Sequence, residues 1–283
     1  MSRRRNEGKA SKPAKQRDVF VARPFAGRAD ETEWVALREI VPAATAPLRL
    51  RSSDAPVTLS TVLPLHWPGM VTRNGTRFLG LQVGSRSGDA SRDLAFVLEQ
   101  VLDAEPGTSV TPTELPGAGP RLQDLLDDAP LEVTVHTGFE YWVEGEEDPT
   151  GEMAESMERA NASVVPTAKV EGQQSAYWCR MRERSHLRWV MPHDEDALLD
   201  ALARLSVAGG LPLGPETRFV GSFRAHGLLV PVWDLPLETE ATDLEKPAAE
   251  FRARLDEALS GGALTTDERR ARAGLLNRQL TLR

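Results

Sequence analysis

The chain has 283 residues, 40% hydrophobic and 27% charged, enough for one large domain or two small ones with a sizeable core. The net charge of -8 hides an asymmetry: residues 1–17 hold seven Lys or Arg and one Glu, about +6, which leaves about -14 on the remainder. An acidic body repels phosphate, so broad nucleic-acid binding is excluded except through this tail or a local patch.

Cysteine content and hydropathy indicate the cellular compartment in which we expect the protein. The single cysteine, Cys179, excludes an intramolecular disulfide framework and a cysteine-based zinc site. No apolar run approaches the roughly 18 residues that span a bilayer, and no apolar segment follows the basic N-terminus as in a signal peptide. We therefore expect a cytoplasmic protein with no membrane partner.

The basic tail, residues 1–17, lacks large apolar residues after Met1. Too little can be buried there to offset the chain entropy, so we expect it to be disordered. It is our candidate contact for nucleic acid or a ribonucleoprotein. The candidate residues are its basic side chains: Arg3, Arg4, Arg5, Lys9, Lys12, Lys15 and Arg17.

The first half reads as strands around a helix. A short helix is expected over 31–41, a strand over 57–63, and a tight turn at Asn74-Gly75 before a strand over 77–83, because both turn residues tolerate positive φ. Asp89 caps a helix with one apolar face. A proline-rich loop over 105–121 precedes expected strands over 131–136 and 139–143.

The second half has a similar order of elements. Strands are expected over 164–170, 176–181, 187–191, 218–223 and 228–232, and Asp194 caps a helix that ends at Gly209-Gly210. The shared order and the Asp at each helix start suggest an internal duplication. The alternative, that any α+β chain shows such runs, remains open.

The C-terminal end reads as an antiparallel helical hairpin. Apolar residues over 244–259 have helical spacing, Gly261-Gly262 interrupts them, and Thr265 with Glu268 forms a capping box for a second helix. We predict an α+β protein of two related antiparallel sheet-and-helix units plus this hairpin. The expected divisions are a tail (1–17), a first unit (18–143), an acidic linker or helix (144–163), a second unit (164–236) and the hairpin (237–283).

One turn is a candidate anion site. The segment GSRSGDASR leads from a predicted strand into a helix start, where backbone N–H groups bind anions. The candidate residues there are Gly84, Arg86, Ser87 and Arg92. Asp89 would occupy or repel the same position, so a capped turn is the favoured interpretation.

No catalytic residue, metal site or cofactor is assigned. The five histidines show no metal-binding spacing, and Cys179 paired with His186 lacks a nameable third group. Tryptophans in His66-Trp67-Pro68, Tyr141-Trp142 and Pro231-Val232-Trp233 could line a recognition groove, although core packing is the commoner fate. The acidic run over 140–158 could dock a basic partner or the tail, with a solvated face as the default.

Four stretches carry a resemblance to a family. They are FVARPFAGRADETEWVALREIVPAATA (20–46), VLPLHWP (62–68), GSRSGDASRDL (84–94) and FVGSFRAHGLLVPVWDLP (219–236). The chain resembles an actinobacterial family of roughly 300-residue proteins of unknown function, and this resemblance implies no activity. Two hypotheses follow: a non-enzymatic interaction protein whose tail contacts nucleic acid or ribonucleoprotein, or an enzyme or small-anion-binding protein that uses the cleft between the units.

Overall fold

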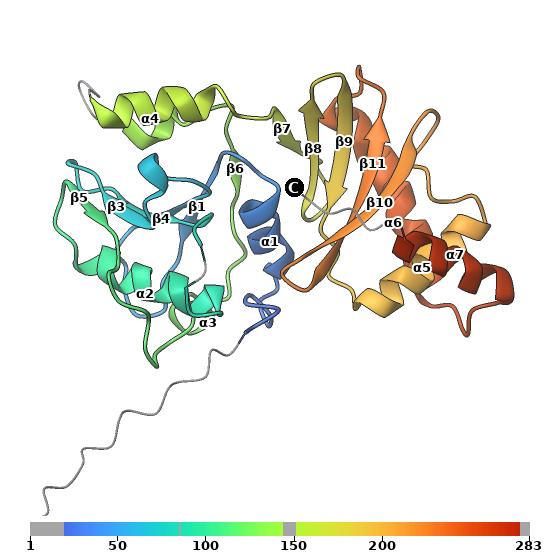
Figure 1. The fold of residues 1–283 in the computed structure, drawn as a ribbon, viewed down its shortest axis with the longest axis horizontal. Helices are drawn as coiled ribbons and strands as arrows, with labels where there is room; N and C mark the ends of the chain where they lie inside the picture. Colours follow the sequence, from blue (N-terminus) through green and yellow to red (C-terminus); the bar gives the residue numbers. More distant parts are fainter. Residues whose placement is uncertain (1–19, 85, 144–150, 278–283) are drawn as a thin grey trace, which may run out of the picture.

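The computed structural model describes residues 20–84, 86–143 and 151–277. Within these residues the fold is α+β, with seven α-helices and two sheets dominated by antiparallel pairs, which confirms the predicted class (Figure 1). The basic tail and its seven candidate contacts lie outside the described residues.

The first sheet has the strand order β5-β3-β4-β2-β1-β6. Its strands are β1 (Ala44–Leu48), β2 (Val57–Ser60), β3 (Gly69–Val71), β4 (Arg77–Gly80), β5 (Thr108–Val110) and β6 (Thr134–Val135). β2 and β4 run parallel, and the other pairs are antiparallel. The predicted turn joins β3 to β4, with Gly75 at φ +89°.

Helices cover both faces of this sheet. α2 (Ala90–Asp103) and α3 (Leu122–Leu125) pack on one face, where Leu79 points. The 3-10 turn η2 (Glu140–Val143) and α4 (Glu152–Asn161) pack on the other face, where Phe78 points. Neighbouring residues of β4 therefore belong to different apolar clusters, as strand alternation requires.

Two local predictions were wrong. The segment 139–143 forms η2 rather than a strand, because Phe139 and Trp142 both turn into the same apolar cluster and the Trp142 indole donates to the Val62 carbonyl at 2.9 Å. Within the loop predicted over 105–121, residues Thr108–Val110 form β5, which pairs with β3.

The second sheet has the order β10-β11-β9-β8-β7, and all its pairs are antiparallel. Its strands are β7 (Thr167–Lys169), β8 (Ala176–Met181), β9 (Arg184–Trp189), β10 (Arg218–Ala225) and β11 (Leu228–Leu235). The two sheets thus differ in strand order, and the first contains a parallel pair. The proposed duplication of the two units stays a prediction.

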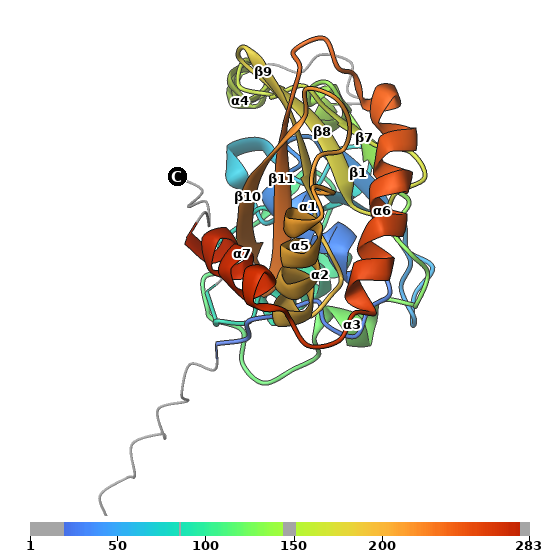
Figure 2. The same cartoon turned by 90° about the vertical axis from the view of Figure 1, so that its right-hand side faces the viewer.

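Three helices form a layer on the outer face of the second sheet. α5 (Glu195–Val207) lies between α6 (Glu245–Leu259), which the short turn η3 (Ala241–Leu244) precedes, and α7 (Thr266–Asn277), as Figure 2 shows. The predicted C-terminal helical pair is confirmed, and each of its helices packs against α5. The predicted caps are also present: Asp89 accepts from Ser91 N at 3.1 Å and Asp194 accepts from Asp196 N at 3.0 Å.

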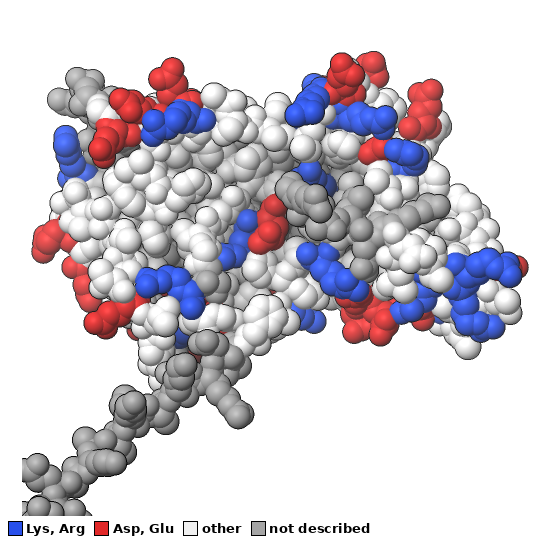
Figure 3. All heavy atoms as spheres, in the orientation of Figure 1, with Lys and Arg blue, Asp and Glu red and all other residues white. Residues whose placement is uncertain are grey.

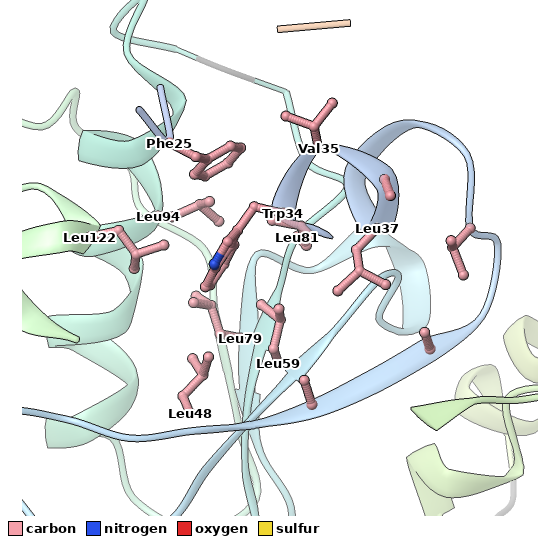
Figure 4. Close-up of a cluster of buried hydrophobic side chains, with 14 of the residues drawn as sticks. Phe25, Trp34, Val35, Leu37, Leu48, Leu59, Leu79, Leu81, Leu94 and Leu122 are labelled. Carbon is pink, nitrogen blue, oxygen red and sulfur yellow. The ribbon is translucent and has the colours of Figure 1, made fainter. Parts of the chain in front are cut away.

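Helix α1 (Glu31–Glu39) connects the two units. Trp34 is fully buried beside Phe25 and is surrounded by leucines of the first unit, as Figure 4 shows. The same apolar cluster includes Tyr177, Val230 and other residues from the inner face of the second sheet. Both units therefore share one core around α1.

A buried carboxylate on α1 also joins the units. Glu33 is 4% exposed; it forms an ion pair with Lys169 and accepts hydrogen bonds from the Tyr177 hydroxyl at 2.7 Å and from Ser175 N at 3.3 Å. Next to it, the Ser175 hydroxyl bonds the Thr32 hydroxyl at 2.8 Å. Because a buried carboxylate is costly unless it is paired and hydrogen-bonded, this site requires both units to be in place.

We predict that Glu33→Ala destabilises the protein by about 1–3 kcal/mol, because buried donors on the second sheet lose their acceptor. Tyr177→Phe removes a single hydrogen bond and should cost about 0.5–1.5 kcal/mol. Urea unfolding of the full chain measures both. Equal stability of Glu33→Ala and wild type would contradict a structural role for this carboxylate.

Candidate functional site

Two pockets adjoin at one end of the first sheet, where β3 begins and β4 and β5 end. Their volumes are about 430 and 370 Å³, and both are lined by His66 and Gln82. We call the pair the His66 groove. Small ligands are generally bound in pockets of about 300–1,000 Å³ with apolar walls and few polar groups.

The walls of the groove come from both faces of the sheet. The larger pocket lies on the α2 side, and its apolar lining is Pro68, Val83, Phe96, Val97, Pro112 and Pro116. The smaller pocket lies on the α4 side, and its apolar lining is Pro42, Val62, Leu63, Leu65, Phe139, Trp142, Ala160 and Val164. Trp142 thus contributes to the groove while its ring remains buried. Trp67 and Trp233 line neither pocket, and Trp233 instead packs in the core of the second sheet.

The backbone at the centre of the groove is unusual. Leu65 and His66, consecutive residues without glycine, have φ values of +54° and +56°. Such left-handed conformations cost of order 1–3 kcal/mol each and persist only when surrounding contacts impose them. Here His66 N donates to the Leu63 carbonyl at 3.0 Å, and Leu65 N donates to the Ser156 hydroxyl of α4 at 3.1 Å.

Close backbone packing holds the exit from this turn. Gly80 N donates to the Pro68 carbonyl at 2.8 Å, and a Cβ atom at Gly80 would lie only 2.7 Å from the Trp67 carbonyl oxygen. A side chain at this position would therefore push the 62–68 segment away from β4. The glycine sets the shape of the groove through this approach.

Helix α1 fixes the other side of the groove. The Gln82 amide nitrogen donates to the carbonyls of Leu37 and Val41, both at 2.7 Å. The Arg38 guanidinium donates to the Leu81 carbonyl and, at 2.6 Å, to the Val83 carbonyl. Burial lowers the pKa of Arg38. The chain that leaves β4 is thus anchored to the C-terminal turn of α1.

Four charged residues line the groove: Arg86, Asp93 and Glu114 in the larger pocket and Arg159 in the smaller one. Figure 3 shows a broad face of the first unit without Lys, Arg, Asp or Glu, bordered by charged side chains near α4 and along the lower edge. Leu65, which lines the smaller pocket, is 42% exposed, and Leu115, beside the larger pocket, is 56% exposed. Exposed apolar patches with a polar border mark interaction sites.

The predicted anion turn adjoins the larger pocket, which Gly84 and Arg86 line. Its amides bind the protein's own carboxylate: Arg86 N and Ser87 N donate to Asp93 at 2.7 and 3.2 Å. Asp89 caps the helix that follows, as expected. An external anion would have to displace Asp93, and anion binding here stays a prediction.

The two arginines of this turn contact the proline-rich loop. Arg86 donates to the Pro112 carbonyl at 2.6 Å, and Arg92 donates to the carbonyls of Gly117 and Pro120, both at 3.1 Å. These bonds tie the loop after β5 to α2. The structure therefore brings Gly84, Arg86, Ser87 and Arg92 together. The side chains of Arg86 and Arg92 are already bonded to carbonyls of the proline-rich loop.

A second group of polar residues lies on the inner face of the second sheet. Cys179 pairs across strands with His186, and His186 Nδ1 lies 3.1 Å from an Asp234 carboxylate oxygen. Asp234 is the third group that the sequence could not supply, because it comes from β11. Asp234 also pairs with Arg184 at 2.9 Å and with Arg218 at 2.6 Å.

Cys179 is poorly suited to be a nucleophile in this arrangement. It is 2% exposed, and burial raises the pKa of its thiol, although Arg188 lowers it by a smaller amount. A raised pKa leaves less of the reactive thiolate near neutral pH. Among the described residues, no cluster of three or more His, Cys, Asp or Glu is placed to bind a metal ion.

Sequence reasoning missed two residues of the groove, Leu65 and Gln82. The segment Pro64–Pro68, with a proline at each end, signals an irregular turn, but left-handed φ at two non-glycine residues has no sequence signature. Gln82 lies at the end of a predicted strand, and its partners are more than 40 residues away in the chain.

Comparisons with known proteins give a family and no activity. The model of a family of unknown function, DUF5926, matches residues 24–283, which include both units and the groove. Searches of curated proteins and of solved structures gave no match. In the described part of the chain, no helix combines the length and apolar character needed to cross a bilayer.

We predict that Cys179 reacts slowly with a thiol reagent such as 5,5′-dithiobis(2-nitrobenzoate) in the folded protein and rapidly after denaturation. The reason is burial, which blocks access and raises the thiol pKa, so the thiolate fraction at neutral pH is small. Absorbance at neutral pH follows the reaction. A folded-state rate equal to the denatured rate would restore the pairing of Cys179 with His186 as a nucleophile and base.

Proposed function

The chain therefore belongs to a family of unknown function, and we propose that it is a non-enzymatic interaction protein that binds its partner in the His66 groove. The supporting observation is the left-handed pair Leu65–His66 at the junction of two apolar pockets. Strained backbone of this kind clusters at ligand-binding and active sites. We place this role in the cytoplasm, on the grounds of cysteine usage and hydropathy.

Binding is favoured over catalysis by the polar groups of the groove. A general base or nucleophile needs a partner within hydrogen-bond reach. The His66 ring has no hydrogen-bond partner among the described residues. The Asp93 carboxylate already accepts hydrogen bonds from two backbone amides. These groups suit orientation of a ligand better than proton transfer.

The rival hypothesis, an enzyme or anion-binding protein that uses the cleft between the units, has weaker support. α1 and the shared apolar cluster occupy much of the contact between the units, with Trp34, Tyr177 and Val230 all buried. The arginines around Asp234 lie on the inner face of the second sheet and are partly neutralised by that carboxylate.

We predict that filling either pocket abolishes partner binding. Thr111→Trp adds a large ring to the lining of the larger pocket, and Ala160→Phe does so in the smaller one; neither residue is fully buried. Affinity capture from native lysate with quantitative mass spectrometry should show proteins that wild type retains and both variants lose.

Matched controls use the same substitutions at nearby positions, two or three residues away in the chain, that lie outside the groove. Thr108→Trp on β5 and Ala162→Phe after α4 change exposed residues that line neither pocket. They should retain the partners that wild type retains. Identical retention by all five proteins would overturn the groove as the binding site.

The tail carries a second candidate function. Its seven basic residues against one acidic residue contrast with the acidic remainder, and we propose that they contact the phosphates of a nucleic acid or ribonucleoprotein. Such binding would be independent of base sequence, since phosphate contacts carry no sequence information.

We predict weak, steeply salt-dependent binding of the full chain to a single-stranded RNA oligonucleotide. Seven cations neutralise at most about seven phosphates, so the slope of log K against log salt should not exceed about 5 in magnitude. Replacing the seven basic residues by serine should remove this binding in a fluorescence-anisotropy titration. Unchanged affinity after the replacement would exclude the tail as the contact.

A further inference from the structure

We propose that the His66 groove takes a peptide segment of a partner protein and that Gln82 binds a backbone N–H of this peptide. The peptide would place an apolar side chain in each pocket, on either side of the N–H that Gln82 accepts. This inference rests on the proposed binding function of the groove and adds the chemical class of its ligand.

The orientation of the Gln82 amide is fixed by the protein. Its nitrogen donates to two main-chain carbonyls, those of Leu37 and Val41, both at 2.7 Å. A carbonyl oxygen only accepts, so the NH₂ group must face α1 and the amide oxygen must face away from it. Gln82 is partly exposed and lines both pockets, and the proposal places this oxygen at their junction.

The amide oxygen of Gln82 accepts no hydrogen bond from any described residue. It is a pre-oriented acceptor whose position is set before the ligand arrives, which lowers the entropic cost of binding. A ligand that covers it without supplying a donor would leave it buried and unpaired. The groove should therefore select ligands that present an N–H or O–H at this point, flanked by apolar groups.

A peptide matches this arrangement better than a compact small molecule. Side chains i and i+1 of a peptide flank one backbone N–H, as the two pockets flank Gln82. Leu65, which lines the smaller pocket, and Leu115, which lies between two lining residues of the larger pocket, are both exposed apolar side chains; this suits a partner larger than the pocket contents. The protein's own basic tail does not fit, because residues 2–17 contain no large apolar side chain.

The test compares an amide with an ester in the same ligand. N-acetyl-Leu-Leu-methylamide is titrated into the ¹⁵N-labelled full chain, and the backbone signals of the 62–68 segment and of Gln82 are followed by NMR. Replacing the central amide by an ester removes one N–H and keeps the shape. The ester should bind roughly tenfold or more weakly, since the Gln82 oxygen then loses its donor.

Two controls separate this contact from general effects of the ester. A second analogue has the ester at the C-terminal methylamide, outside the junction, and should bind as the parent peptide does. The variant Gln82→Met removes the acceptor, so parent and central ester should bind it with equal affinity, as in a double-mutant cycle. If Gln82→Met does not fold, the comparison of the two esters on wild type still decides.

The outcomes distinguish this inference from the proposed function. Equal binding of parent and central ester to wild type would overturn the role of Gln82 and leave the groove as a binding site. No response of the groove signals to the peptide would overturn the peptide as the ligand. The proposal that the groove is a binding site is overturned only if the Thr111→Trp and Ala160→Phe variants also retain the same partners as wild type.

Discussion

The structure depends on the burial of Glu33 between the two units. A carboxylate in this position is tolerated because Lys169, Tyr177 and Ser175 of the second unit supply a charge and two donors. The helix that carries it is therefore held against the second sheet on one side and against the first unit on the other. At the C-terminal end of the same helix, the Leu37 carbonyl accepts from Gln82, and Arg38 donates to the carbonyls of Leu81 and Val83. The geometry of the groove is thus a consequence of how the two units are joined.

Local elements could be predicted where residues close together in the sequence determine them. The two Asp caps, the Asn74-Gly75 turn and the strand over 176–181 follow from short-range chemistry and are present in the structure. β1 could not be predicted, because Ala44–Leu48 contains Pro47 and little β-branched character, and it forms through pairing with β2 and β6. The arrangement of strands also depends on long-range contacts, which is why two similar orders of elements gave two different sheets.

The site was less predictable than the fold. The sequence indicates Trp67, Trp142 and Trp233 as groove candidates, with core packing as the favoured fate. Only Trp142 lines a pocket of the groove, and Trp233 is fully buried. The sequence does not indicate Gln82, since an isolated glutamine at a strand end has no distinguishing pattern. Its orientation arises from the carbonyls of Leu37 in α1 and of Val41 just after it. The turn before α2 does present backbone amides, as the sequence indicates. The carboxylate of Asp93, four residues beyond Asp89, accepts their hydrogen bonds. A carboxylate and an external anion compete for the same donors, and the intramolecular one has the higher effective concentration.

The left-handed pair at Leu65 and His66 indicates which part of the groove is specialised for contact. Glycine would adopt this backbone without strain, so side chains at these two positions carry a conformational cost. Backbone hydrogen bonds to Leu63 and Ser156 hold this conformation. The side chains themselves gain little inside the protein, because Leu65 is 42% exposed and the His66 ring has no hydrogen-bond partner among the described residues. Both side chains are instead presented beside a fixed acceptor and two apolar pockets. Binding of a partner is the step at which their burial and pairing would offset the strain.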